Sequence, residues 1–230
     1  MQYRRLRDPN RPAPGKAFLV CGQNKLRLTL QFSTQCYGGE QLIYDGNTLH
    51  VSASTQSFRK SPLGLVIRTQ PVLVQEGLIG GILNTNWVLL HKDVADQLRD
   101  EEIKRIDGNS ALSVRYRPKG RSDLQIHLYF EPDTFRHIMS IYTFTVPKPG
   151  RSSDGLSVST GAVVMGGETH YRLEERFSDF KVFDGLTLPT TYHIVLEEDV
   201  IGVGGDTKIF EIKTQNILNN APVDPANFGG

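Results

Sequence analysis

The chain has 230 residues, of which 38% are apolar and 22% charged, and 26 basic against 25 acidic residues give a formal net charge of +1. With a mean hydropathy of -0.31, this composition excludes a disordered chain and a bundle of membrane-spanning helices. The near-neutral charge provides no overall field that would attract nucleic acid or an anionic membrane. We therefore expect a globular domain with no nucleic-acid partner and no transmembrane segment.

The N-terminal segment differs in composition from the rest of the chain. Residues 1–16 contain three prolines and four arginines, which predicts an extended lead-in without a core of its own. We expect one domain over residues 17–228. The segment has no apolar core of a signal peptide, so export is not encoded in the sequence shown.

Strands dominate the predicted structure. Between residues 25 and 32 apolar and polar side chains alternate strictly, so that Leu26, Leu28, Leu30 and Phe32 share one face. Strict alternation is the pattern of a half-buried strand. Two such strands joined by a short polar turn are expected at 42–51, at 124–146 and at 171–196. A closing strand at 208–217 brings the sheet to about eight to eleven strands, a size at which sheets curl or close.

One long segment departs from the strand pattern. From Leu63 to Trp87 apolar residues recur at intervals of three and four, which predicts helices, broken near Pro71 and at Gly80-Gly81. Residues 93–105 predict a further, polar helix that Asp107-Gly108 ends. The predicted fold is therefore mainly β (α+β), a curved antiparallel sheet that forms an incomplete barrel with a helical lid inserted at about 62–106.

No catalytic or metal-binding pattern stands out. The six histidines form no His-x-x-x-His or Cys/His cluster, no Gly-x-Ser-x-Gly turn presents a nucleophile, and Gly202–Asp206 lacks the Lys-Ser/Thr of a phosphate loop. We expect a protein that is not an enzyme and has no catalytic residue, metal or cofactor. An enzyme is an alternative to the two kinds of binding protein described below, and its turnover would depend on a titrating residue such as His137.

Two local arrangements follow from the strand pattern. Leu128 is expected opposite His137, which would make this histidine a hydrogen-bonded core residue among Ile126, Phe130, Met139 and Ile141. Glu174 and Glu175 are neighbours on a strand, so their side chains point to opposite faces and cannot act as a carboxylate pair. One of them is expected to be solvated and the other partnered.

The two cysteines leave two possibilities open. Cys21 and Cys36 can form a disulfide in an oxidising compartment if their strands pair, or remain two buried free thiols. Two cysteines are too few for a disulfide framework or a zinc site.

The apolar faces likewise allow two interpretations. The strands and the helical segment can form a filled core, or the lid can cover an apolar cavity for an acyl chain or similar ligand, with Gly77, Gly80 and Gly81 permitting lid movement. The candidate cavity residues are Leu26, Leu28, Leu30, Phe32, Leu78, Ile79, Ile82, Trp87, Leu124, Ile126, Leu128 and Met139.

Three segments carry a family resemblance: the run Tyr171–Pro189, the strand pair Glu40–Val51 around Asp45-Gly46, and the ending Asn220–Phe228. With them the chain resembles the outer-membrane lipoprotein-sorting superfamily, the LolA/LolB-like half-barrels, over about residues 15–228, and most closely uncharacterised bacterial envelope proteins with that domain. The resemblance implies an incomplete antiparallel barrel wrapped around helices, with an apolar cavity that holds acyl chains in carrier members. Members are normally exported, whereas this chain begins after their usual N-terminal helix.

The resemblance implies a periplasmic or cell-envelope location and a non-enzymatic protein that binds a lipid, an acylated lipoprotein or another amphiphile between sheet and helices. The alternative is a structural or regulatory envelope protein with a filled core. Such a protein would bind a protein partner through a sheet edge or through the loop at 147–167.

Overall fold

The structure is a computed structural model that describes residues 2–5, 13–32, 38–53, 62–119, 123–146, 168–202 and 204–229. Twelve strands account for most of them: β1 (Gln2–Arg5), β2 (Ala13–Gly22), β3 (Lys25–Phe32), β4 (Gly39–Tyr44), β5 (Leu49–Ala53), β6 (Leu98–Ile106), β7 (Asn109–Tyr116), β8 (Gln125–Phe130), β9 (His137–Val146), β10 (Thr169–Phe183), β11 (Leu186–Val200) and β12 (Gly204–Lys213). The helical elements are α1 (Pro62–Thr69), α2 (Val72–Gln75) and the 3₁₀ turns η1 (Gly81–Leu83), η2 (Val88–Leu90), η3 (Val94–Gln97) and η4 (Pro225–Phe228).

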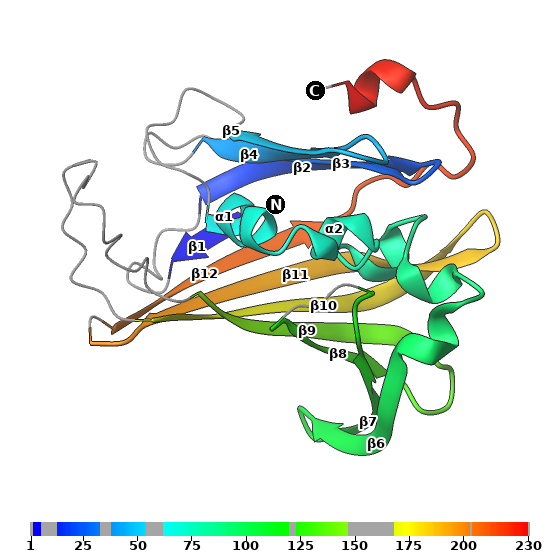
Figure 1. Ribbon diagram of the computed structural model, residues 1–230. Helices are drawn as coiled ribbons and strands as arrows, with labels where there is room; N and C mark the ends of the chain where they lie inside the picture. The colour runs from blue at the N-terminus through cyan, green and yellow to red at the C-terminus, as the bar shows by residue number, and fades with distance from the viewer. Residues whose placement is uncertain are drawn as a thin grey trace, which may run out of the picture.

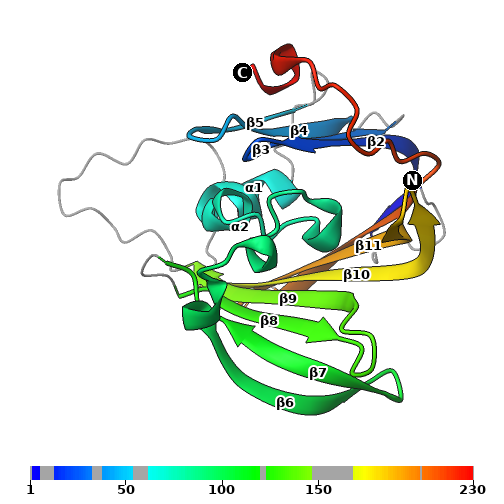
Figure 2. The ribbon, with the colours of Figure 1, turned by 90° about the vertical axis from the view of Figure 1, so that its right-hand side faces the viewer.

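The strands form one curved, antiparallel sheet that does not close. Their order is β5-β4-β3-β2-β1-β12-β11-β10-β9-β8-β7-β6, so β5 and β6 are its edges within the described part of the chain. Figures 1 and 2 show β2–β5 above, β8–β11 below, and α1 and α2 between them. This arrangement confirms the predicted mainly β fold and incomplete barrel.

The predicted strand pairs β4–β5, β8–β9 and β10–β11 are confirmed. The residues in two of the connecting turns show why the chain reverses there. Between β4 and β5, Asp45 Oδ1 accepts from the backbone N–H groups of Asn47 (2.8 Å) and Thr48 (2.6 Å), and Gly46 adopts φ +98°. Asp184 and Gly185 both have positive φ in the turn between β10 and β11, as a two-residue hairpin turn requires. The closing strand β12 occupies 204–213 rather than 208–217.

The helix predicted over residues 93–105 is wrong. Only η3 is helical there, and Leu98–Ile106 is β6, which pairs with β7 around a turn at Asp107-Gly108. An Asp-Gly pair can end a helix or make a hairpin turn. Here it makes a hairpin turn, because the segment before it pairs with β7. Ile103 in the middle of this segment is 62% exposed. The helical lid therefore ends at Gln97.

The rest of the helical prediction holds, with shorter pieces. The breaks predicted near Pro71 and at Gly80-Gly81 are present, because α1 ends at Thr69, α2 begins at Val72, and both glycines adopt positive φ. We refer to residues 62–97 as the lid.

The register predicted at His137 is also wrong. Phe130 pairs with His137, and Leu128 pairs with Ser140, because the ladder shifts between Tyr129 and Phe130. Phe135 adopts φ +53° in the connecting turn. A turn of this geometry adds a residue to one strand, which alternation alone does not reveal.

The lead-in predicted at 1–16 contributes backbone pairs to the sheet. β1 pairs with β12 and, through two residue pairs, with β2, and β2 runs across the predicted boundary at residue 17. Division of the chain at this boundary stays a prediction. Cys21 in β2 is a free thiol whose Sγ lies 3.8 Å from the Leu83 carbonyl, whereas Cys36 lies outside the described residues.

The C-terminal segment crosses from one layer to the other. The Thr214 N–H donates to Thr190 O (2.8 Å) beside β11, and the Asn219 side chain donates to Phe183 O (3.2 Å). Farther on, Phe228 of η4 is buried under the ammonium group of Lys25 in β3, 5.7 Å from the ring centroid. Residues 214–229 thus connect the β10–β11 hairpin to β3 (Figure 1).

Candidate functional site

The lid covers the concave face of the sheet. Leu73 and Leu78 of the lid, and Leu30, Ile126 and Leu173 of the sheet, have no exposed surface. A side chain beside a water-sized void would keep some accessible area, so these values indicate close packing around these five side chains. The described residues of sheet and lid thus share one hydrophobic core.

Most of the predicted cavity residues lie together in this core: Leu26, Leu28, Leu30, Phe32, Leu78, Ile79, Trp87, Leu124, Ile126 and Leu128. Ile82 is partly buried against the same cluster. Met139 lies in a second cluster with Ala111 and Tyr129. It therefore does not face the lid. A role in ligand binding stays a prediction for all of them.

A polar group that alternation did not single out joins the lid to the sheet. Glu175 of β10 has no exposed surface, and its Oε1 accepts from the Gly80 N–H of the lid at 2.9 Å. The hydroxyl groups of Tyr192 and Tyr142 also contact this carboxyl group, Tyr142 at 2.8 Å. The sequence showed only that Glu175 is an acidic residue on the inward-facing side of its strand. It did not point to Gly80 as the partner, because the two residues are 95 positions apart.

The contacts of Tyr142 fit a protonated Glu175. Tyr142 Oη lies 2.8 Å from Glu175 Oε2 and 3.1 Å from the Leu78 carbonyl of the lid. A phenol has one hydrogen and the carbonyl has none to donate. If Glu175 is protonated and donates to Tyr142 Oη, the phenol hydrogen is left for the Leu78 carbonyl and both contacts are full hydrogen bonds.

Burial favours the protonated form of Glu175. Desolvation raises the pKa of Glu175 above its ordinary value, more than its contacts with Tyr192, Gly80 and Tyr142 lower it. Burial, together with the negative charge that Glu175 would carry, raises the pKa of Tyr142 and of Tyr192 well above the ordinary range. The phenols therefore remain donors.

His137 is a hydrogen-bonded core residue, as predicted. Its ring packs against Trp87, Phe130 and Phe177 with centroid distances of 4.7, 5.4 and 4.9 Å. Nε2 lies 2.9 Å from Ser140 Oγ. Burial lowers the pKa of His137 to about 3, so the ring is neutral and positions the lid by packing.

Glu174 and Glu175 point to opposite faces, as predicted, but neither is solvated. Glu174 is 5% exposed and makes ion pairs with Arg172 and Arg176. Two guanidinium groups therefore cover the carboxylate that was expected to face water. A carboxylate on an outer face can be buried by long side chains from its own strand.

Other polar contacts hold the rim of the lid. Glu76 accepts from the Tyr116 hydroxyl (2.5 Å) and from the Lys119 N–H (2.9 Å). Gln70 donates to Asp123 Oδ1 at 3.0 Å. The lid is thus fastened to the β7–β8 end of the sheet as well as to Glu175.

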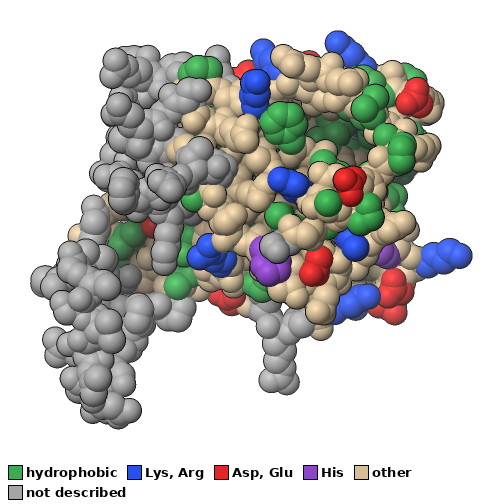
Figure 3. Space-filling model, turned by 90° about the horizontal axis from the view of Figure 1, so that it is seen from above, with side chains coloured by type: hydrophobic (Ala, Val, Ile, Leu, Met, Phe, Trp, Pro, Cys, Tyr) green, Lys and Arg blue, Asp and Glu red, His purple; other side chains and the backbone are tan. Residues whose placement is uncertain are grey.

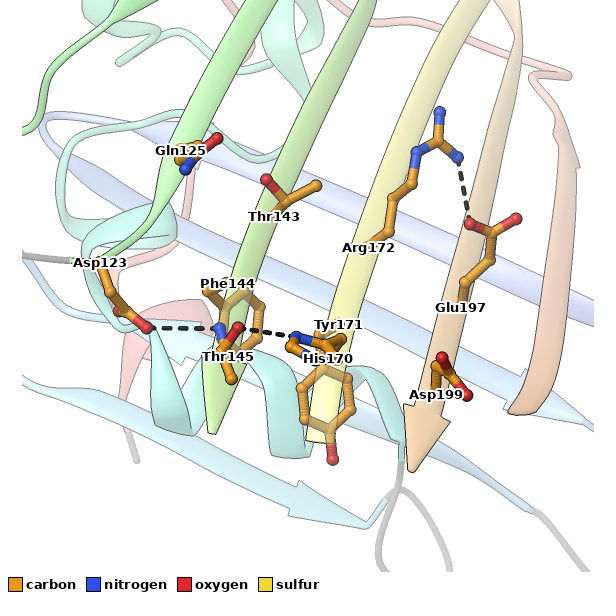
Figure 4. Close-up of a pocket in the computed structure, with 10 residues that line it drawn as sticks. All are labelled: Asp123, Gln125, Thr143, Phe144, Thr145, His170, Tyr171, Arg172, Glu197 and Asp199. Atoms are coloured by element: carbon orange, nitrogen blue, oxygen red, sulfur yellow. Dashed lines mark hydrogen bonds and ion pairs between the residues drawn. The ribbon is translucent and has the colours of Figure 1, made fainter. Parts of the chain in front are cut away.

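Two hollows lie elsewhere on the described part of the sheet. One of about 550 Å³ lies at the ends of β9–β11, where Arg172 pairs with Glu197 at 3.4 Å and Thr145 Oγ1 lies 2.9 Å from His170 Nδ1 (Figure 4). Another, of about 500 Å³, is lined by Met139, Arg176 and neighbours. No group of three metal-ligating side chains occurs among the described residues.

The face drawn in Figure 3, seen from above in the orientation of Figure 1, has no patch of one charge sign. Lysine, arginine, acidic and hydrophobic side chains are interspersed across its described part. Within the described residues no helix is long and apolar enough to cross a membrane.

Comparison with known proteins gives distant structural likenesses. No protein-family model and no curated protein matches the chain. A LolA-superfamily protein from Nitrosomonas europaea is 12% identical over 95% of this chain and 85% of that one, with a TM-score of 0.40. A domain assigned to outer membrane lipoprotein sorting, from Vibrio parahaemolyticus, is 8% identical over 91% and 81%, with a TM-score of 0.37.

The MucA/MucB complex of Pseudomonas aeruginosa contains a chain that is 11% identical over 91% of this chain and 85% of that one, with a TM-score of 0.24. The first two structures belong to the superfamily that the sequence resembles. TM-scores below 0.5 carry no conclusion about what this chain binds.

Proposed function

We propose that this protein is a non-enzymatic binding protein of the bacterial cell envelope. In this proposal it takes up a lipid, an acylated lipoprotein or another amphiphile between sheet and lid when the lid moves. The location follows from the sequence resemblance to lipoprotein-sorting half-barrels. The observation that supports this ligand class is the apolar concave face of the sheet, which in the described part of the chain is covered by the irregular lid.

The construction of the lid supports its displacement. Its helical pieces are short, and α2 has four residues, whereas isolated helices below about 12 residues are marginal in water. The lid therefore keeps its shape through packing against the sheet. An acyl chain offers the same apolar contacts, so it can replace the lid residues without leaving the concave face exposed to water.

Uptake of a fluorescent long-chain fatty acid tests the proposal, together with native mass spectrometry and lipid extraction of protein purified from an envelope fraction. Leu73→Ala removes lid packing, and Leu42→Ala is its matched control, because both side chains have no exposed surface and only Leu73 lies in the lid. Each substitution is expected to cost about 2–5 kcal/mol of stability. Only Leu73→Ala is expected to speed uptake of the probe.

The close packing of the described core residues favours a second candidate, a structural or regulatory envelope protein that binds a protein partner. A clean ligand-free mass, with no probe uptake by the wild type or by Leu73→Ala, would contradict the first proposal and support the second. The loop at 147–167, one of its two predicted contact sites, lies outside the described residues.

A further inference from the structure

The two edges of the sheet differ in their covering. Beside β5, the Arg68 guanidinium of α1 donates to the Val51 carbonyl. Beyond β6, no strand of the described chain follows, and Figures 1 and 2 show β6 as the outermost strand of its layer. Ile103 in the middle of β6 is 62% exposed. An uncovered edge strand offers unpaired backbone groups to another strand.

The charges along β6 are divided at Ile103. Glu101 and Glu102 precede it, and Lys104 and Arg105 follow it. Glu102 and Lys104 side chains are about half and two fifths exposed, and they lie 2.6 Å apart within the strand. Because an antiparallel partner runs in the opposite direction, a second copy of β6 would set the acidic half of one strand against the basic half of the other.

The alternation of an edge strand limits the possible registers. Only every second residue directs its backbone groups outward, so a symmetric antiparallel pair is centred on a residue and not between two residues. Centres at Glu102 or Lys104 would place like charges opposite each other, which is destabilising. A centre at Ile103 pairs Ile103 with its copy, Glu102 with Lys104 and Glu101 with Arg105.

We propose that the chain forms a homodimer through β6, paired antiparallel about Ile103 with a second copy. Each dimer gains two regular cross-strand pairs of opposite charge, each between Glu102 of one copy and Lys104 of the other, and continues the sheet from one protomer into the other. The ladder irregularity between Arg99 and Glu102 leaves Glu101 at the margin of this regular pairing, where it and Arg105 are opposite in sign. Contacts of this size give weak dimers that salt weakens further.

Sedimentation velocity of the full chain tests the proposal, from about 5 to about 500 μM, the range in which small interfaces dissociate. The weight-average mass is expected to rise with concentration from 25.7 kDa toward twice that value, and to fall again when salt is added. A wild-type mass that stays at one chain over the whole range overturns the proposal.

Variants with exchanged charges on β6 test whether this strand forms the dimer interface. Glu101→Lys with Glu102→Lys makes the strand basic, and Lys104→Glu with Arg105→Glu makes it acidic. Each double variant alone is expected to stay monomeric, whereas their equimolar mixture is expected to associate, because every facing pair is then opposite in sign. Lys213→Glu, at a 73% exposed side chain of β12, is the control and is expected to associate like the wild type.

Two further results would overturn the proposal. Association of either double variant alone would place the contact on another surface. A mixture that stays monomeric would show that charge pairing along β6 does not hold two copies together. Unchanged melting temperatures of the double variants, expected for exposed positions, distinguish loss of association from loss of fold.

Discussion

Replacing Glu175 by glutamine should change how the stability of the protein depends on pH. Glutamine keeps the shape of the protonated acid, and its amide can donate to Tyr142 Oη while its oxygen accepts from Gly80 and Tyr192. The hydrogen bonds between lid and sheet are therefore preserved. Only the ability to ionise is lost.

The direction of this pH dependence follows from the difference in proton binding between the folded and unfolded states. The pKa of Glu175 is raised in the folded protein above its ordinary value of 4.5, so the folded state binds the proton more tightly than the unfolded state. The stability gained in this way is complete below the unfolded pKa and is lost as pH rises through the folded pKa. In that window the wild type loses roughly 1 kcal/mol per pH unit through this group.

The measurement is urea unfolding of both proteins from pH 4 to pH 8. We expect Glu175→Gln to match the wild type near pH 4 and to exceed its free energy of unfolding increasingly toward pH 8. A difference that is the same at every pH would refute the protonated assignment of Glu175. Glu174→Gln is the control, because it removes a carboxylate that Arg172 and Arg176 hold, and it should lower stability at pH 8.

Three further predictions concern packing and access. Gly81→Ala should destabilise the protein by about 2 kcal/mol or more in thermal unfolding, because the new Cβ would lie 2.7 Å from the His137 ring at a residue with positive φ. Gly108→Ala is the control, because a Cβ there meets no atom within 4 Å. A loss of stability for Gly81→Ala no larger than that for Gly108→Ala would contradict the prediction. Leu78→Ala should lower the free energy of unfolding by about 2–5 kcal/mol, because Leu78 is buried, whereas Leu218→Ala, at an exposed position, should lower it by about 0.5 kcal/mol or less. Equal urea unfolding midpoints for the two variants would contradict this prediction. Burial raises the pKa of Cys21 to about 11, so a thiol reagent at pH 7 should modify it slowly in a Cys36→Ser protein until denaturant is added; fast modification of Cys21 in this native variant would contradict the prediction.

Local sequence signals predicted the strand pairs well. Alternation from Lys25 to Phe32 and the Asp-Gly turns at residues 45 and 184 act over a few residues, and nothing in the fold opposes them. The same kind of signal failed at residues 98–106, where a polar sequence ending in Asp-Gly fits a helix and a hairpin equally. The neighbouring strand β7 decided the outcome, and its position depends on the whole sheet.

The candidate site was only partly predictable. The apolar residues of lid and sheet could be assigned to one core because each lies on the inward face of its element. The attachment of Gly80 to Glu175 could not, because it joins residues that no local pattern relates. The separation of Met139 from this core depended on the ladder shift at Phe130, which reverses the faces that simple alternation assigns.

The connection between the two layers of the sheet has a mechanical consequence. Among the described residues, the layer of β2–β5 and the layer of β6–β12 share a backbone ladder only through β1, which contributes two residue pairs to β2. The C-terminal segment forms a second tie, since it begins beside β11 and ends with Asn227 O accepting from the Arg27 guanidinium at 3.3 Å. Because both layers also pack against the lid in one hydrophobic core, any change in the angle between them would require lid contacts to break first.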